Sequence, residues 1–185
     1  MNRALIVIDV QESFRARPYW QMGELPAFLA NTQSLIDRCV ARGIPVLQVF
    51  HQESGAAATD PFAPASGLVR TLEGLKLAPA AIFHKEVHSA MFARSADGTT
   101  LEAWLRDHRI GEIMITGIRT EQCCETTARH ASDLGFEVRY ITDATLTFPM
   151  KRAGRAFSTE EIRERTELVL DGRFAEIVST ADALA

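Results

Sequence analysis

Three residues that could act together in covalent catalysis each follow a short apolar run of this chain. Asp9 comes after ALIVI, Lys85 comes after AAIFH, and Cys123 lies just past EIMITGI. A thiol attacks a carbonyl carbon as the thiolate, and a neighbouring carboxylate can take its proton and later give it to a leaving group. An acid, a base and a thiol in one place therefore predict cleavage of an amide through a thioester.

The surroundings expected for Cys123 favour the thiolate. The residue falls in the first turn of a predicted helix, whose N-terminus carries a partial positive charge, and Lys85 would add a full one. We therefore expect the pKa of Cys123 to be lowered. Backbone N–H groups of the same turn would point at the oxyanion that forms on the attacked carbonyl.

The elements that must position these residues alternate along the chain. Short apolar runs rich in β-branched residues predict strands, and stretches with helical apolar spacing lie between them. Capping-box spacings occur at Thr99 with Glu102 and at Ser158 with Glu161. The predicted strands cover 3–10, 44–50, 80–87, 109–118, 136–144 and 174–180, and the helices cover 26–42, 97–108, 121–134 and 158–170.

Nearly continuous apolar strands separated by helices are typical of a parallel sheet that is covered on both faces. The sequence thus predicts an α/β fold, a Rossmann-like three-layer α/β/α sandwich with a six-stranded parallel sheet. Ligands of such sheets bind at the carboxyl ends of the strands, where Asp9, Lys85 and Cys123 are expected. The segment from His51 to Pro79 is rich in Ala, Pro and Gly and predicts a long loop, of a length that often covers an active site.

Length, charge and composition predict a single-domain protein that binds neither nucleic acid nor a membrane. A chain of 185 residues predicts one domain, residues 1–185, and a net charge of −4 argues against binding nucleic acid or an anionic membrane. No apolar run approaches the roughly 20 residues that span a bilayer. The three cysteines form no disulfide framework, which indicates a reducing, cytoplasmic location. The expected partner is a small-molecule substrate.

The two adjacent cysteines are expected to have different roles. Spacings of three, four and seven residues link Cys124 to Thr127, Ala128 and Ala131, a stripe of small residues suited to packing on the sheet. Cys123 is instead expected to face the site at the strand ends that contains Asp9 and Lys85. The two thiols could also act as a redox or binding pair, which is a function of a different class.

Three longer blocks of the chain carry a resemblance to a known family. LIVIDVQESF, HKEVHSAM and TGIRTEQCCETTARHASDLGFEVRYITDAT occur in this order within residues 3–148. They resemble the signature blocks of the isochorismatase-like cysteine hydrolases. That family includes nicotinamidases, N-carbamoylsarcosine amidases and ureidoacrylate amidohydrolases.

The resemblance implies an Asp-Lys-Cys triad on a six-stranded α/β/α fold. The family's aspartate matches Asp9, its lysine matches Lys85, and its nucleophile matches Cys123, the first cysteine of the C-x-E-x-T-A-R pattern. Gln11 completes the family's D-x-Q pattern, and both Gln11 and the aromatic residue after it, Phe14, would line the substrate pocket. The family commonly forms dimers or tetramers, so a homo-oligomer is implied.

The resemblance further implies a non-proline cis peptide bond just before the threonine of the TGxxT turn. Here that bond would join Arg119 and Thr120. It would aim backbone N–H groups of the turn, together with that of Cys123, at the oxyanion. Arg119 and Thr120 are therefore expected to form the oxyanion turn.

One departure from the family's pattern concerns metal binding. Nicotinamidases of the family hold a metal through an Asp-x-His, followed later by a second His, after the second strand. The matching region, FHQESGAAATDPF, offers His51, Glu53 and Asp60 without that spacing. The sequence therefore predicts no metal and no other cofactor, and it disfavours a nicotinamidase.

A second function is possible on the same fold. Isochorismatases proper hydrolyse an enol ether by protonation, with the aspartate as the acid and without reliance on the thiol. Asp9 could serve that reaction. The presence of Cys123 favours the branch of the family that cleaves amides.

Overall fold

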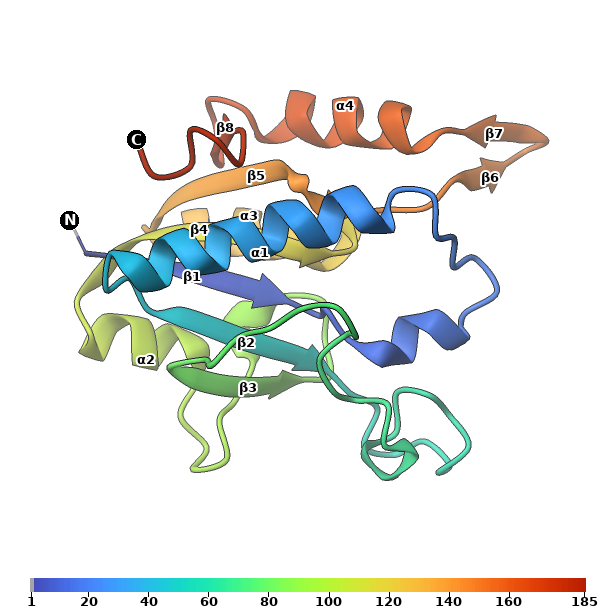
Figure 1. Cartoon of the computed structure of the whole chain (residues 1–185), viewed down its shortest axis with the longest axis horizontal. Coiled ribbons are helices and arrows are strands. Elements are labelled where there is room, and N and C mark those ends of the chain that lie inside the picture. The colour runs from blue at the N-terminus through green and yellow to red at the C-terminus, as the bar shows by residue number, and fades with distance from the viewer. Residues whose placement is uncertain (1) are drawn as a thin grey trace.

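The structure, a computed structural model, describes residues 2–185 and is built around one six-stranded sheet (Figure 1). All neighbouring strands of this sheet pair in parallel, in the spatial order β3-β2-β1-β4-β5-β8. With helices on both of its faces, the sheet confirms the predicted α/β/α sandwich. The strands are β1 (Asn2–Ile8), β2 (Val46–His51), β3 (Ala81–Lys85), β4 (Ile110–Ile118), β5 (Glu137–Leu146) and β8 (Glu176–Val178).

Four helices of the described residues pack around the sheet, one on its front face and the others behind it or beside α3. α1 (Leu25–Ala41) lies across the face that is in front in Figure 1. α2 (Leu101–Asp107) and α3 (Glu125–Asp133) lie behind the sheet, and α4 (Thr159–Leu170) packs against α3. Among residues 2–185 we find no helix both long and apolar enough to cross a bilayer.

The central strand β1 shows how the sequence specifies these layers. Successive side chains of a strand point to opposite faces. Leu5 and Val7 accordingly join the hydrophobic cluster under α1, whereas Ala4, Ile6 and Ile8 join the cluster under α2 and α3. All five are fully buried, so β1 has no solvent-exposed face and reads as a continuous apolar run.

The starts of two helices test the predicted capping boxes. α4 begins after Ser158, whose Oγ accepts the Glu161 N–H at 3.1 Å while the Glu161 carboxylate accepts the Ser158 N–H at 2.8 Å, which confirms that capping box. The box predicted at Thr99 with Glu102 is wrong. The N-cap of α2 is Thr100, because Thr99 still belongs to the hydrogen-bonded turn that precedes the helix.

Two segments lie outside the regular alternation. The chain between β2 and β3 is the expected long loop, with one short 3₁₀ turn at Pro64–Ser66. A two-stranded antiparallel hairpin, β6 (Met150–Arg152) and β7 (Arg155–Phe157), was not predicted. The hairpin and much of the loop lie toward the right of Figure 1, the side to which the arrowheads of β1, β2 and β3 point.

The order of the strands places β1 at the centre of the ligand-binding edge. The chain proceeds from β1 to β2 and β3 on one side and then returns to β4 on the other side of β1. Ligands of open α/β sheets bind where the strand order reverses in this way. The carboxyl end of β1, at Asp9, is therefore the place from which to examine a site.

Candidate active site

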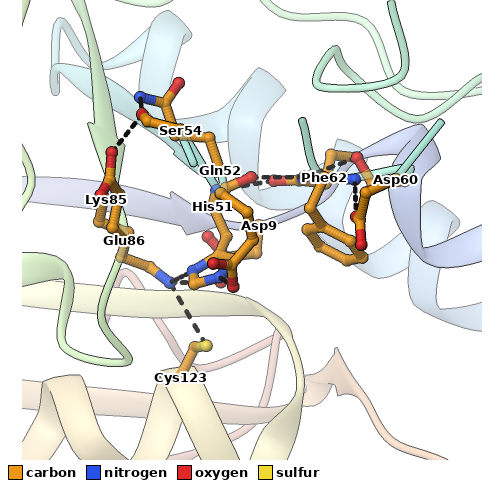
Figure 2. Close-up of polar contacts among 12 residues, drawn as sticks. Asp9, His51, Gln52, Ser54, Asp60, Phe62, Lys85, Glu86 and Cys123 are labelled. Carbon is orange, nitrogen blue, oxygen red and sulfur yellow. Dashed lines mark hydrogen bonds and ion pairs between the residues drawn. The ribbon is translucent and has the colours of Figure 1, made fainter. Parts of the chain in front are cut away.

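The ends of β1 and β3 and the turn after β4 bring the three predicted residues Asp9, Lys85 and Cys123 together (Figure 2). Lys85 Nζ lies 2.7 Å from Asp9 Oδ2 and 3.3 Å from Cys123 Sγ. The side chains of Asp9 and Lys85 are 0% exposed, and Cys123 as a whole is 7% exposed. The three groups thus form one buried polar network.

The backbone around Asp9 is shaped for this position. Asp9 has a left-handed conformation, with φ of 54°, which turns the chain out of β1 immediately after its last residue. Beside it, β4 approaches β1 so closely at Gly117 that an added Cβ would lie 2.0 Å from the Ile8 carbonyl oxygen. Only glycine fits there, and its φ of 141° is also one that glycine favours.

The charge state of Lys85 follows from its two partners. Burial lowers the pKa of the Lys85 ammonium, but the Asp9 carboxylate and the Cys123 sulfur raise it by more. The net pKa of Lys85 is therefore above its ordinary value. The site holds a permanent ammonium between an acid and a thiol.

The pKa of Cys123 moves in the direction opposite to the one expected. Burial raises the pKa of this thiol well above its ordinary value, and the Asp9 carboxylate raises it further, whereas Lys85 lowers it by less. The expected lowering by Lys85 and the helix start is thus wrong, because the expectation left out desolvation. The resting group is a thiol that must give up its proton to react.

The candidate acceptor of the Cys123 thiol proton is the Asp9 carboxylate. Its Oδ2 accepts a hydrogen bond from the Lys85 ammonium, whereas its Oδ1 is buried and has no hydrogen-bond partner among residues 2–185. A buried oxygen without a donor is costly to leave unsatisfied. The charge of Asp9 acts on the Cys123 thiol strongly enough to raise its pKa, and the free oxygen provides a place for the thiol proton.

Cys124 lies in the core, as its spacing predicts. It is fully buried in the hydrophobic cluster that also contains Ala128 and Ala131, and burial raises its pKa well above the ordinary value. Both neighbouring thiols are free. Both cysteines lie in a π-helical turn, Thr120–Cys124, that precedes α3. The structure gives no support to a redox pair.

The turn after β4 corrects one prediction. The cis peptide bond joins Ile118 and Arg119, one residue before the predicted bond between Arg119 and Thr120. The Arg119 guanidinium pairs with Glu121 at 2.9 Å and lies 4.7 Å from the centre of the Tyr19 ring. The role of this turn in holding an oxyanion stays a prediction.

Thr120 itself is held by the protein interior. Its Oγ1 lies 2.7 Å from Thr145 Oγ1, and its carbonyl oxygen accepts the Tyr140 hydroxyl at 2.7 Å. Each of these side chains is fully buried. The side chain of Thr120 and its carbonyl oxygen therefore anchor the turn to β5.

The two residues predicted to line the pocket contact protein groups instead. The Gln11 amide donates to the His51 carbonyl oxygen at 2.9 Å and accepts the His51 N–H at 2.8 Å. Phe14 packs edge-on against Phe62 of the long loop, with ring centres 5.1 Å apart. Gln11 thus fixes the end of β2, and Phe14 supports the loop. Contact of either residue with a substrate stays a prediction.

One member of the network, His51, was not predicted from the sequence. His51 Nδ1 lies 3.3 Å from Lys85 Nζ (Figure 2). His51 Nε2 lies 3.1 Å from Glu53 Oε1. His51 ends the run IPVLQVFH, so the rule that selected the other strand ends also points to it. The sequence analysis weighed it only as a metal ligand.

The residues at this position do not fit a metal centre. Among residues 2–185, no three His, Cys, Asp or Glu side chains converge in a way that could hold an ion. His51 and Glu53 contact each other, while Asp60 accepts the backbone N–H of Phe62 at 2.8 Å. The absence of a metal from the working protein stays a prediction.

The long loop is fastened beside the site. Its backbone bonds to the segment after β1 through three hydrogen bonds of 3.0 Å each, formed by residues 10, 12 and 13 with residues 72, 70 and 68. Phe62 of the loop meets the His51 ring edge-on at 5.7 Å, and the Arg17 guanidinium covers Phe62 at 4.5 Å. The loop and the segment after β1 are therefore joined to each other beside the network of Asp9, Lys85 and Cys123, and we call them the rim.

Tyr19 completes this rim. Burial raises the pKa of its hydroxyl, Arg119 and Arg17 lower it, and Cys123 raises it. The Arg119 guanidinium, 4.7 Å from the centre of the Tyr19 ring, joins this phenol to the turn after β4.

Comparison with known proteins gives a consistent result. The family model described as the Isochorismatase domain matches residues 3–182. A nicotinamidase of Escherichia coli K12 is 32% identical, with 76% of this chain and 81% of that protein covered. Nicotinamidase 3 of Arabidopsis thaliana is 30% identical, with 95% and 83% covered. An isochorismatase-family structure from Chromobacterium violaceum superposes with a TM-score of 0.85 at 26% identity, covering 98% of this chain and 91% of that one.

Proposed function

This chain is a hydrolase of the isochorismatase family, and on that premise we propose that it cleaves the C–N bond of a small amide, ureide or carbamoyl compound through a thioester on Cys123. The observation that carries the proposal is the Lys85 ammonium, 2.7 Å from Asp9 and 3.3 Å from the sulfur. The names of both curated relatives, which are nicotinamidases, also favour an amide.

The first half of the reaction begins with the Cys123 thiol. Asp9 takes the thiol proton, and the Lys85 ammonium stabilises the thiolate that results. The thiolate attacks the carbonyl carbon and forms a tetrahedral intermediate whose oxyanion is held by backbone N–H groups of the turn that begins at Arg119. The C–N bond then breaks while protonated Asp9 gives its proton to the departing nitrogen. A thioester and an amine, or ammonia, are the products of this half.

The second half restores the enzyme. Asp9, again a carboxylate, takes a proton from a water molecule that attacks the thioester carbonyl carbon. The C–S bond breaks, the acid product leaves, and the sulfur recovers a proton from Asp9. Because the resting pKa of Cys123 is raised, the proton acceptor is essential to this scheme, and Lys85 alone would not ionise the thiol.

The proposal also covers the oligomeric state and the cellular location of the enzyme. We propose a homo-oligomer, a dimer or a tetramer, that works in the cytoplasm on a small molecule. Sedimentation of the purified protein measures the first of these directly, and a monomer at working concentration would contradict it.

The test compares the two neighbouring cysteines. Ammonia or amine release is measured for wild type, Cys123→Ala and Cys124→Ala with a panel that contains nicotinamide, a ureide and a carbamoyl amine. We expect Cys123→Ala to lose turnover on the order of 10⁴-fold or more, since removing a nucleophile has effects of this size. Cys124→Ala should keep most of it. A dead Cys124→Ala together with an active Cys123→Ala would refute the assignment.

The same variants distinguish the enol-ether reaction. Isochorismatase-type hydrolysis uses Asp9 as the acid and does not need the sulfur. Full activity of Cys123→Ala on an enol-ether substrate, with no amide of the panel cleaved by wild type, would replace the amide proposal with that function.

A further inference from the structure

The Lys85 ammonium has three polar neighbours, and only two of them belong to the triad. Its Nζ lies 2.7 Å from Asp9 Oδ2, 3.3 Å from Cys123 Sγ and 3.3 Å from His51 Nδ1 (Figure 2). An ammonium carries three N–H donors and no acceptor. Each donor of Lys85 therefore has one partner, and the direction of any one N–H depends on the other two.

The contact with Lys85 determines the tautomer of His51. Because the ammonium can only donate, Nδ1 of the ring must be the acceptor, and the ring proton must lie on Nε2. Nε2 lies 3.1 Å from Glu53 Oε1, which accepts that proton. The neutral ring is thus oriented from both sides, with its lone pair toward Lys85 and its N–H toward a carboxylate.

The protein fixes the position of His51 as well as its tautomer. His51 and Lys85 are direct partners in the pairing of β2 with β3, so their side chains leave the sheet edge side by side. Both hydrogen bonds of the Gln11 amide with His51 go to its backbone, and Phe62 packs against its ring. The imidazole is 16% exposed and Glu53 is 51% exposed, so the ring separates the buried pair from solvent.

We propose that His51 is a positioning residue of this site, which takes the third hydrogen of the Lys85 ammonium and thereby keeps the other two on Asp9 and Cys123. The inference rests on the proposed function, in which the sulfur must lose its proton beside that ammonium. Without an acceptor at Nδ1, Lys85 rotates or draws in water, and the thiolate loses an aligned donor. Glu53 acts through His51 by fixing the ring.

The decisive readout is the reactivity of the sulfur, which needs no knowledge of the substrate. Iodoacetamide forms an S–C bond with the thiolate and releases iodide, and peptide mass spectrometry identifies the alkylated cysteine. We expect His51→Leu to slow alkylation of Cys123 about 10- to 100-fold, the effect of a small misplacement at a reacting centre. His51→Asn should restore most of the rate, because its amide oxygen can accept near the position of Nδ1.

Two further variants complete the design. Glu53→Leu should slow alkylation by less, and Glu53→Gln should not, because its amide oxygen still accepts from Nε2. Glu53 is half-exposed, so this pair keeps the test available if His51→Leu does not fold. His84→Leu is the matched control, since His84 is adjacent to Lys85 on β3 but packs its ring on Phe50, with ring centres 5.6 Å apart.

Alkylation and turnover can fail separately. Wild-type alkylation rates in both His51→Leu and Glu53→Leu would overturn the positioning role of His51, even if wild type cleaves amides. The predicted pattern of alkylation, with no cleavage of any amide by wild type, would support the role of His51 and refute the proposed function. If His84→Leu slowed the alkylation of Cys123 as much as His51→Leu does, the role of His51 would also be overturned. Any substitution at this edge of the sheet would then slow alkylation, whether or not it contacts Lys85.

Discussion

Two ion pairs of nearly equal length lie in opposite surroundings in this protein. Lys85 and Asp9 are 2.7 Å apart at the sheet edge with both side chains 0% exposed, whereas Arg155 and Glu161 are 2.8 Å apart between the hairpin and α4 with side chains 66% and 42% exposed. Water screens the second pair and can replace either partner. No water can replace a partner in the first pair, so burial rather than distance distinguishes the two pairs.

The largest effect should come from breaking the buried pair. Lys85→Met leaves the Asp9 carboxylate buried without a counter-charge, which typically costs about 3–5 kcal/mol of the free energy of unfolding. Activity should fall on the order of 10³-fold or more, because the thiolate loses its cation. Urea denaturation and amide turnover measure the two effects.

The control for Lys85→Met is the double variant with Asp9→Asn. It removes both charges, so it should recover part of the stability that Lys85→Met loses while activity stays absent. A denaturation midpoint of Lys85→Met equal to that of wild type would mean that Asp9 does not carry a buried charge, and the comparison of the two pairs would fail.

An intermediate effect should appear at alkaline pH in a thiol that is remote from the site. Cys39, in α1, is fully buried, and burial raises its pKa from 9.0 to about 11. The folded state then holds this proton more tightly than the unfolded state, so the stability it contributes is complete below pH 9 and is lost as the pH rises toward 11. This rise in the pKa of Cys39 corresponds to about 2–3 kcal/mol of the free energy of unfolding.

The measurement is the free energy of unfolding of wild type and Cys39→Ala from pH 8 to pH 11. The curve for the variant should fall less steeply over this range. Cys123 and Cys124, whose pKa values burial also raises, add to the fall in both proteins. Parallel curves would show that Cys39 ionises as easily in the folded protein as in the unfolded chain.

The smallest effect should come from the exposed pair. Arg155→Ala removes the partner of Glu161 and a guanidinium that lies 4.4 Å from the centre of the Phe157 ring. Exposed pairs contribute about 0–1 kcal/mol, less at high salt, so the denaturation midpoint should move little and turnover should not change. A loss as large as that of Lys85→Met would show that distance alone decides the strength of a pair.

The fold could be predicted from the sequence because its signals are local. Apolar runs such as ALIVI have no solvent-exposed face, and that pattern identifies a central parallel strand without any knowledge of its neighbours. The hairpin β6–β7 could not be found this way. Its strands have three residues each, carry Lys151, Arg152 and Arg155, and bury little. The extent of one domain over residues 1–185 stays a prediction.

The site could be predicted only in part, for a related reason. The positions of Asp9, Lys85 and Cys123 follow from where strands end, which is a property of the sequence. The raised pKa of Cys123 follows from desolvation by the whole surrounding fold, and no local pattern reports it. His51 was within reach of the strand-end rule, but it was considered only as a possible metal ligand, in the segment that matches the metal-binding region of nicotinamidases.

The central claim is that Cys123 attacks the carbonyl, and trapping the thioester tests it most directly. Wild-type protein is mixed with excess substrate from the amide panel, quenched in acid during turnover, and digested for peptide mass spectrometry. The account predicts an acyl group on Cys123 that disappears as the substrate is exhausted. An acyl group on Cys124, or amide turnover that persists in Cys123→Ala, would contradict it.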